Sequence, residues 1–274
     1  MRDMGWWRRH HDDASGEVVL AVDFPLSGRN EAGFDELAPL LGPSVALWET
    51  LPQPAPDGRL SGREAVGRWL ADLRHSGVRV RALLSYCAGA AFVGALSDGV
   101  SAWQERPPEI VMFDPEVPSS LTVYAQFVRA IDRFAPVLTE AEVTRIRAEA
   151  EAVWTEHAHA LDPMLERLGE MFRELGEAAF EKGALDRRHG GELIEAFMSF
   201  IGYLAAGSQM DALPAWKRAT AISSHTPING LNLVPDAERA DLVADEVRLD
   251  LPHADLLRSP ECARLVTEAL AASP

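Results

Sequence analysis

Cysteine is scarce in this sequence, and long uninterrupted apolar stretches are missing. Only 2 of the 274 residues are cysteines, Cys87 and Cys262. They are too few for a disulfide framework, and they lack the short spacing of a zinc or redox site. We therefore expect both thiols to be reduced, no metal to be bound, and the protein to be cytoplasmic. No stretch approaches the roughly 18 apolar residues of a membrane-spanning helix, so we expect no such helix.

Positive charge is also in short supply. Lys and Arg total 26 against 42 Asp and Glu, which gives a formal net charge of −16. A net negative charge repels nucleic acids and anionic membrane surfaces. The composition therefore argues against both as partners.

The N-terminal residues contain a pair of arginines, Arg8 and Arg9, such as an export signal would carry. No apolar region follows them, and carboxylates come instead, among them Asp12 and Asp13. This pattern does not fit an export signal. We expect residues 1–17 to form a surface-lying N-terminal tail.

Short apolar runs alternate with helical patterns over much of the chain. The predicted strands are 18–22, 44–48, 78–84, 109–113, 219–223 and 246–251, and the predicted helices are 34–41, 61–75, 89–96, 235–244 and 259–271. Strands that alternate with helices in this way predict βαβ units and a parallel sheet.

One long interval, residues 118–213, interrupts this alternation because it shows only helical periodicity. We therefore predict an α/β core made of residues 18–117 and 214–274. The interval between them is predicted to be an all-helical insertion.

The segment Ser85-Tyr86-Cys87-Ala88-Gly89 lies where a predicted strand meets a predicted helix. A G-x-S-x-G motif places a nucleophile on such a sharp turn, where the residues two before and two after it must be small. Ser85 and Gly89 meet that requirement, so Cys87 is the predicted nucleophile. The N-terminus of the following helix is expected to favour its thiolate. A buried cysteine that merely packs as a small hydrophobic residue is one alternative, and Ser85 as nucleophile is another.

Three further segments accompany this motif along the chain. They are Phe24-Pro25-Leu26-Ser27-Gly28, Ile110-Val111-Met112-Phe113-Asp114 and Leu251-Pro252-His253-Ala254-Asp255. Together with the Cys87 segment they resemble motifs of the thioesterases that release acyl chains from nonribosomal peptide and polyketide assembly lines. The resemblance runs from about Val18 to Ala271. Two features depart from the family pattern: cysteine replaces serine as nucleophile, and no Gly-Asp precedes His253.

The resemblance implies an α/β-hydrolase fold with a catalytic triad of Cys87, Asp114 and His253. The order nucleophile, acid, histidine is the order that hydrolases of this fold use. The resemblance also implies an oxyanion hole built from backbone N–H groups, which would belong to Ala88 and to Leu26 or Ser27.

Both the acid and the histidine have alternatives. Some members of the family carry the acid after the penultimate strand, but Ser224-His225-Thr226-Pro227 contains no carboxylate there. This absence favours Asp114, with Asp236 and Asp255 next in line. His225 is the alternative to His253.

The resemblance further implies a thioesterase that releases acyl or peptidyl chains by hydrolysis or cyclisation. The small-molecule acyl chain would be carried on the phosphopantetheine arm of a carrier protein, and no cofactor of the enzyme's own is expected. An acyl group on cysteine remains an activated thioester, so an acyltransferase that shuttles acyl groups between carrier proteins is an alternative. A hydrolase-fold binding module without catalysis is a third possibility.

In the same interpretation, the helical insertion at 118–213 would be a lid that forms the acyl pocket. The pocket candidates are aromatic or aliphatic residues of one apolar run, Phe197, Phe200, Tyr203 and Leu204. For each of them, packing in an ordinary hydrophobic core is the alternative.

Overall fold

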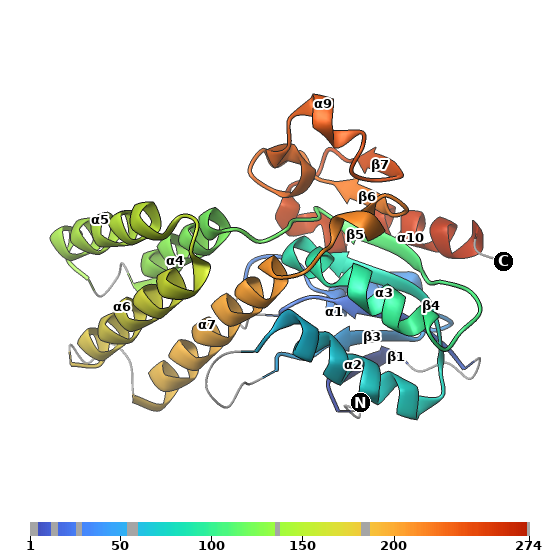
Figure 1. The fold of residues 1–274 in the computed structure, drawn as a ribbon, viewed down its shortest axis with the longest axis horizontal. Helices are drawn as coiled ribbons and strands as arrows, with labels where there is room; N and C mark the ends of the chain where they lie inside the picture. Colours follow the sequence, from blue (N-terminus) through green and yellow to red (C-terminus); the bar gives the residue numbers. More distant parts are fainter. Residues whose placement is uncertain are drawn as a thin grey trace. The chain divides into compact units, whose positions relative to one another are not determined.

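A computed structural model describes residues 5–11, 16–25, 29–53, 60–134, 138–181 and 187–272. Its centre is a sheet with the strand order β1-β3-β2-β4-β5-β6-β7 (Figure 1). The strands are β1 (Trp7–His11), β2 (Glu17–Val22), β3 (Leu47–Thr50), β4 (Arg79–Tyr86), β5 (Glu109–Phe113), β6 (Thr220–Ser223) and β7 (Asp245–Arg248). All neighbouring strands in this sheet are parallel except β1, which pairs antiparallel with β3 at one edge. The predicted parallel sheet is therefore confirmed.

The central strands follow from their continuous apolar sequences. In β2 the five residues after Glu17 are buried, and in β5 the four residues after Glu109 are buried. Strands covered on both faces need apolar side chains at every position, which explains the absence of a polar alternation.

Helices cover both faces of this sheet. The helix α1 (Phe34–Leu41) packs with α10 (Pro260–Ala272) in one hydrophobic cluster that also includes side chains of β2, β4 and β5. Figure 1 shows α2 (Gly62–Ser76) and α3 (Val93–Ser101) on the face of the sheet toward the viewer. Shorter elements complete the α/β unit: η1 (Cys87–Ala91), α8 (Leu213–Trp216), η2 (Gly230–Leu233), α9 (Asp236–Arg239) and η3 (His253–Arg258).

The prediction of a surface-lying tail at residues 1–17 was wrong for residues 7–11, which form β1. Trp7 is fully buried, and its indole Nε1 donates a hydrogen bond to the carbonyl of Trp69 over 3.2 Å. His10 also contacts the buried carboxylate of Glu49 on β3, with 2.8 Å between Nε2 and Oε2. An edge strand that buries one tryptophan has no apolar periodicity, so the sequence pattern did not reveal it.

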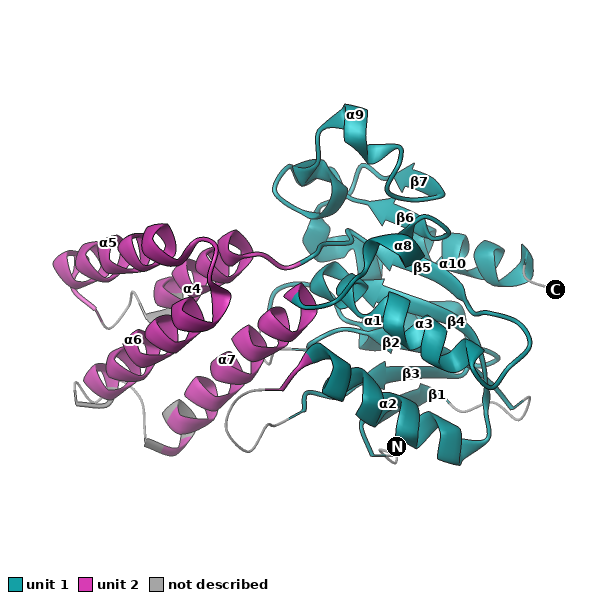
Figure 2. Ribbon diagram, viewed as in Figure 1, with its two compact units in different colours: residues 1–53, 62–117, 209–274 teal, residues 54–61, 118–208 magenta. Residues whose placement is uncertain are grey.

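The chain divides into two compact units (Figure 2). One consists of residues 1–53, 62–117 and 209–274, and the other of residues 54–61 and 118–208. The second unit contains four helices in its described residues: α4 (Ser120–Phe134), α5 (Glu140–His157), α6 (Leu161–Glu181) and α7 (Arg187–Ser208). Helices α4, α6 and α7 meet in an aromatic cluster of Phe127, Phe172 and Phe197. The rings of Phe172 and Phe197 stack in it with 3.9 Å between centroids. No helix of the described chain is both long and apolar enough to cross a membrane.

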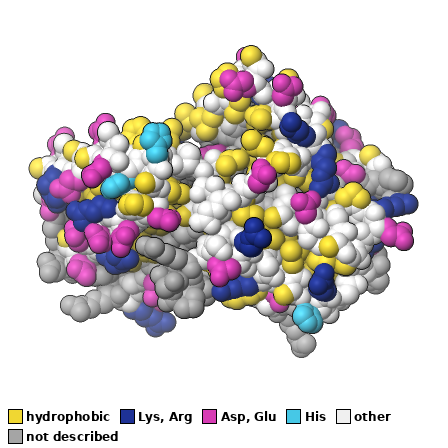
Figure 3. All heavy atoms as spheres, in the orientation of Figure 1, with side chains coloured by type: hydrophobic (Ala, Val, Ile, Leu, Met, Phe, Trp, Pro, Cys, Tyr) yellow, Lys and Arg dark blue, Asp and Glu magenta, His cyan; other side chains and the backbone are white. Residues whose placement is uncertain are grey.

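Charged side chains of both signs lie interspersed on the face of the molecule drawn in Figure 3. The deficit of positive charge does not produce a continuous acidic surface on that face. The carboxylates of the helical unit contribute to local ion pairs, such as Arg145 with Glu149 and Arg167 with Glu170.

Candidate active site

Several polar residues follow the carboxyl ends of adjacent parallel strands. Asp23 follows β2, Cys87 follows β4, Asp114 follows β5, and Ser224 follows β6. The neighbours of β2 are β3 and β4, so the chain order reverses direction across the sheet at this point. Open α/β sheets bind their ligands at the carboxyl ends of the strands beside such a reversal. The topology therefore makes this edge the candidate active site.

Cys87 occupies the turn between β4 and the short helix η1. Its φ is +51°, in the left-handed region that costs a residue with a Cβ about 1–2 kcal/mol. Ser85 and Gly89, two residues before and after it, are buried, and both have the small side chains that such a turn requires. A positive φ at a strand-to-helix turn is also what a nucleophile elbow has, and it occurs at the segment where the sequence predicts one. The role of Cys87 as nucleophile stays a prediction.

Asp114 and His253, the predicted acid and base, contact each other directly. His253 begins η3, and its ring Nδ1 lies 2.7 Å from Oδ2 of Asp114, a carboxylate with no exposed surface. The other oxygen, Oδ1, accepts a hydrogen bond of 2.8 Å from the backbone N–H of Ser224. An ionised Asp114 accepts from Nδ1–H, so Nε2 is the nitrogen of His253 that can accept a proton.

The thiol of Cys87 lies among carboxylates. Its Sγ is 3.9 Å from Oε2 of Glu116, and the backbone N–H of Glu116 donates to the Cys87 carbonyl over 3.2 Å. Burial raises the pKa of the Cys87 thiol well above its usual value, and the charge of Glu116 raises it further. Asp23 and Asp114 act in the same direction.

The backbone N–H of Ala88 lowers the pKa of Cys87, as the sequence analysis expected from a helix N-terminus. Burial and the nearby carboxylates outweigh it, however, so the expectation of a favoured thiolate was wrong. Burial and the nearby carboxylates therefore favour the protonated thiol over the thiolate at Cys87.

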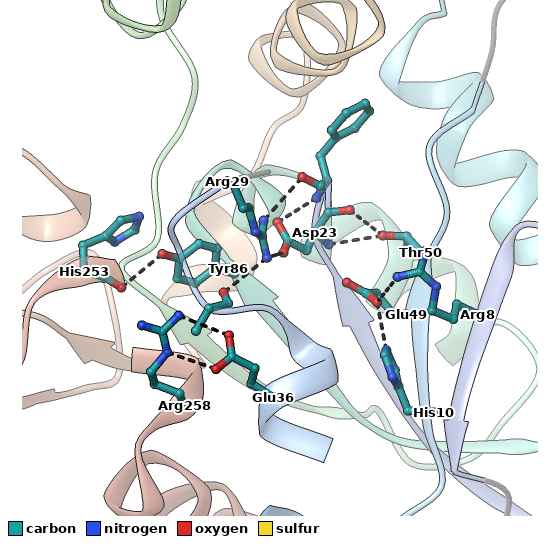
Figure 4. A network of polar contacts seen from close by, with 12 residues as sticks. Arg8, His10, Asp23, Arg29, Glu36, Glu49, Thr50, Tyr86, His253 and Arg258 are labelled. Carbon is teal, nitrogen blue, oxygen red and sulfur yellow. Dashed lines mark hydrogen bonds and ion pairs between the residues drawn. The ribbon is translucent and has the colours of Figure 1, made fainter. Parts of the chain in front are cut away.

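His253 also contacts Tyr86, which lies beside a network of polar side chains that includes Arg29 and Asp23 (Figure 4). Arg29 donates to Oδ2 of Asp23 over 2.6 Å and to the carbonyl of Ala32 over 3.2 Å. The hydroxyl of Tyr86 donates to the carbonyl of His253 over 3.1 Å, and the two rings stack with 4.7 Å between centroids. Burial raises the pKa of Asp23, against the lowering effect of Arg29.

The remaining predicted residues fall in different places. Ala88 follows Cys87 directly, whereas Leu26 and Ser27 lie outside the described residues. Phe197 and Leu204 of α7 are buried, and Phe200 and Tyr203 of the same helix are partly exposed. A pocket role for these four residues of the helical unit stays a prediction.

The alternative triad residues lie apart from the Asp114 contact. His225 is exposed and pairs with Asp250 at 2.9 Å, and Asp255 pairs with Arg258 at 2.7 Å. Asp236, on α9, is exposed and contacts Arg239. Within the described residues, no group of three or more His, Cys, Asp or Glu side chains could hold a metal ion.

Four residues of the site were missed by the sequence analysis: Asp23, Arg29, Tyr86 and Glu116. Tyr86 and Glu116 were adjacent to predicted site residues, next to Cys87 and two positions after Asp114. Their closeness to Cys87 and Asp114 in the sequence could have suggested a place in the site, but only the fold shows which side chains are in contact. Arg29 and Asp23 pair although they lie six residues apart, and nothing in the sequence pattern marks that contact.

No model of a known protein family and no curated protein matches this chain. Solved structures do match it over nearly its full length. The NocB thioesterase domain from the nocardicin cluster is 14% identical, with 97% of this chain and 99% of that chain covered and a TM-score of 0.54. The type II thioesterase BorB from the borrelidin biosynthetic cluster is also 14% identical, with 99% and 98% covered and a TM-score of 0.53.

An alpha/beta hydrolase from Sphaerobacter thermophilus gives a similar result, with 14% identity, 96% and 95% coverage and a TM-score of 0.51. At such identities the likeness establishes the fold and not the activity. The predicted α/β-hydrolase fold, with its mostly parallel sheet, is thereby confirmed.

Proposed function

We propose that this protein is a thioesterase or acyltransferase that forms an acyl-S-enzyme on Cys87. The observation that carries the proposal is the contact of 2.7 Å between His253 and the buried Asp114. This pair lies at the same sheet edge as an elbow whose apex, Cys87, has a φ of +51°. Thioesterase domains among the structures of the same fold support the choice of substrate class.

In the first step, His253 acts as general base toward a protonated Cys87. Nε2 accepts the thiol proton while Sγ attacks the thioester carbonyl, and Asp114 stabilises the imidazolium that forms. The raised pKa of the Cys87 thiol favours this route over a preformed thiolate–imidazolium pair, since a thiolate is disfavoured beside the carboxylate of Glu116.

The tetrahedral intermediate needs hydrogen-bond donors for its oxyanion. The backbone N–H of Ala88 at the start of η1 is one candidate, and Leu26 or Ser27 remains the predicted source of the second. One such donor contributes about 2.7–4 kcal/mol in a related hydrolase. When the intermediate collapses, the phosphopantetheine thiolate leaves and takes the proton from His253, which gives acyl-S-Cys87 and a free carrier thiol.

The acyl group then passes to a second nucleophile, whose proton His253 accepts as the Cys87 thiol is restored. Water or an internal amine or hydroxyl would make the protein an off-loading thioesterase. Another carrier thiol would make it an acyl shuttle, and cysteine favours this possibility because the acyl-enzyme remains a thioester. An acyl-serine would be an oxoester and would have lost that activation.

The proposal is tested by incubating the protein with acyl-carrier thioesters that carry different acyl chains. Each reaction is run with and without a second carrier protein that bears a free phosphopantetheine thiol. We expect loss of the donor thioester above its spontaneous rate, and no such loss with Cys87→Ala. Free acid or cyclised product indicates a thioesterase, and an acylated second carrier indicates a shuttle. If no donor in the panel is consumed faster than in buffer, the fold serves as a binding module and the proposal is wrong.

A further inference from the structure

We propose that Tyr86 is a positioning residue that holds the imidazole of His253 for its reaction with Cys87. This inference rests on the proposed function, because it assigns to Tyr86 a task in the same acyl transfer. Tyr86 makes two different contacts with His253, one to its backbone and one to its ring.

The first contact fixes the backbone of His253. The phenol hydroxyl of Tyr86 donates to the carbonyl of His253 over 3.1 Å, and Thr226 Oγ1 accepts from the N–H of His253 over 2.8 Å. Both backbone polar groups of the histidine are therefore held by side chains. Since η3 begins at His253, these contacts set where the side chain leaves the backbone.

The second contact limits rotation of the imidazole. The rings of Tyr86 and His253 lie 4.7 Å apart with 20° between their planes, which is a stacked arrangement (Figure 4). Asp114 holds the edge of the same imidazole through Nδ1. A hydrogen bond alone allows the ring to tilt about the Nδ1–Oδ2 direction, and a stacked ring on one face opposes that tilt.

Tyr86 is itself held in place. It is 3% exposed, and the guanidinium of Arg29 lies 5.6 Å from the centroid of its ring. Arg29 in turn donates a hydrogen bond to Asp23, which holds its guanidinium beside the ring of Tyr86. Burial raises the pKa of the Tyr86 phenol, which keeps the hydroxyl protonated and able to donate at any pH at which the protein would act.

Tyr86 is also the residue immediately before Cys87 on the chain. The last residue of β4 therefore positions the base, and the next residue supplies the nucleophile. Tyr86 therefore connects Cys87, through the peptide bond, with His253, through a hydrogen bond and ring stacking.

Tyr86→Phe and Tyr86→Leu separate the two contacts. The phenylalanine variant retains the stacked ring and loses the hydroxyl, so we expect kcat for donor consumption to fall about 3–10-fold at unchanged KM. The leucine variant loses both contacts, so its kcat should fall further, by more than about tenfold, and phenylalanine should thus rescue part of the loss.

The NMR signals of the His253 ring in the unreacted protein give a readout that does not depend on turnover. They are assigned by their loss in His253→Gln. We expect the Tyr86→Phe variant to retain the upfield ring-current shift of these signals and Tyr86→Leu to lose it. If the wild-type protein consumes no donor, the proposed function fails, and the NMR result still decides whether Tyr86 holds His253.

Trp7→Phe is the matched control, because it also removes a hydrogen bond from a buried aromatic side chain to a backbone carbonyl while retaining an aromatic ring. Trp7 lies on β1 at the sheet edge, so its loss should lower stability and leave the His253 signals and kcat per folded molecule unchanged. If both Tyr86 variants behave like Trp7→Phe, with unshifted His253 signals and unchanged kcat, Tyr86 has a structural role only and the inference is overturned.

Discussion

At the scale of single residues, Cys87 combines a strained backbone conformation with a thiol whose pKa is raised. The φ of +51° at Cys87 is unfavourable for any residue with a Cβ, and the carboxylate of Glu116 lies 3.9 Å from its sulfur. The strained backbone lowers the stability of the turn, whereas the carboxylate of Glu116 favours the protonated thiol, which can donate to it. A protonated thiol at Cys87 should resist adventitious oxidation and alkylation, because the thiolate is the reactive form.

Glu116→Gln tests whether the carboxylate of Glu116 raises the pKa of the Cys87 thiol. Removing the charge should lower the pKa of the Cys87 thiol, so that a larger fraction is thiolate at any pH below that pKa. Two unit charges about 4 Å apart interact by about 1 kcal/mol even in bulk water, so alkylation of Cys87 by iodoacetamide at pH 8 should accelerate at least about fivefold. The pH profile of alkylation should move to lower pH.

Glu109→Gln serves as the control, since Glu109 is an exposed carboxylate at the other end of the strand that precedes Glu116. Its alkylation profile should coincide with that of the wild type. An unchanged profile for Glu116→Gln would mean that burial alone sets the reactivity of the thiol.

Asp114→Asn tests the orienting acid. Asparagine can still accept the hydrogen bond from the Ser224 N–H, so the fold should survive, but the charge that orients and stabilises the imidazolium is lost. A comparable change in a serine protease lowers kcat about 10⁴-fold, and we expect a loss of similar order in donor consumption. Asp236→Asn, at an exposed position on α9, should have no effect. A loss below tenfold for Asp114→Asn would place the acid elsewhere.

At the scale of elements, the loop after β6 completes the site by closing on the end of β5. The backbone of Ser224 donates to Asp114, and Gly230 in η2 approaches so closely that a Cβ there would lie 2.7 Å from Cα of Asp114. Gly230 also has a φ of +56°. Only glycine combines this backbone conformation with this approach.

Gly230→Ala and Gly77→Ala form a matched pair for this contact. Both positions have positive φ, but nothing lies within 4 Å of a Cβ built at Gly77, at the end of α2. Gly77→Ala should lower the free energy of unfolding by about 1–2 kcal/mol and leave kcat unchanged. Gly230→Ala should cost more stability in urea unfolding and also reduce kcat, because Asp114 must move. Equal effects of the two variants on both quantities would refute a role of Gly230 in placing Asp114.

Apolar patterns in the sequence identify some strands and not others for a physical reason. β2, β4 and β5 are buried on both faces, so their apolar runs identify them and the parallel sheet that they form. β1 was missed because an antiparallel edge strand is held mainly by backbone pairing with β3, and its sequence contains arginine and histidine. Hydrophobic periodicity reports burial and not pairing.

At the scale of the whole molecule, the strand order explains why sequentially distant residues meet. Parallel strands place their carboxyl ends at one edge, so a residue after β4, one after β5 and a loop after β7 converge there. The resemblance of the sequence to thioesterases pointed to Asp114 and His253, which the structure brings into contact. It could not reveal Glu116 or the stacking of Tyr86 on His253, because those contacts depend on side-chain directions that no spacing encodes.

The central claim is that an acyl-enzyme forms on Cys87. It is tested by incubating the protein briefly with an acyl-carrier thioester and measuring the mass of the protein and of its peptides. We predict one added acyl group on the peptide that contains Cys87, lost in Cys87→Ala and retained in Cys262→Ala. Cys262 is fully buried in α10, and burial raises the pKa of its thiol to about 12, so it should not react. Acyl label on Ser85 or Cys262, or undiminished labelling of Cys87→Ala, would contradict the account.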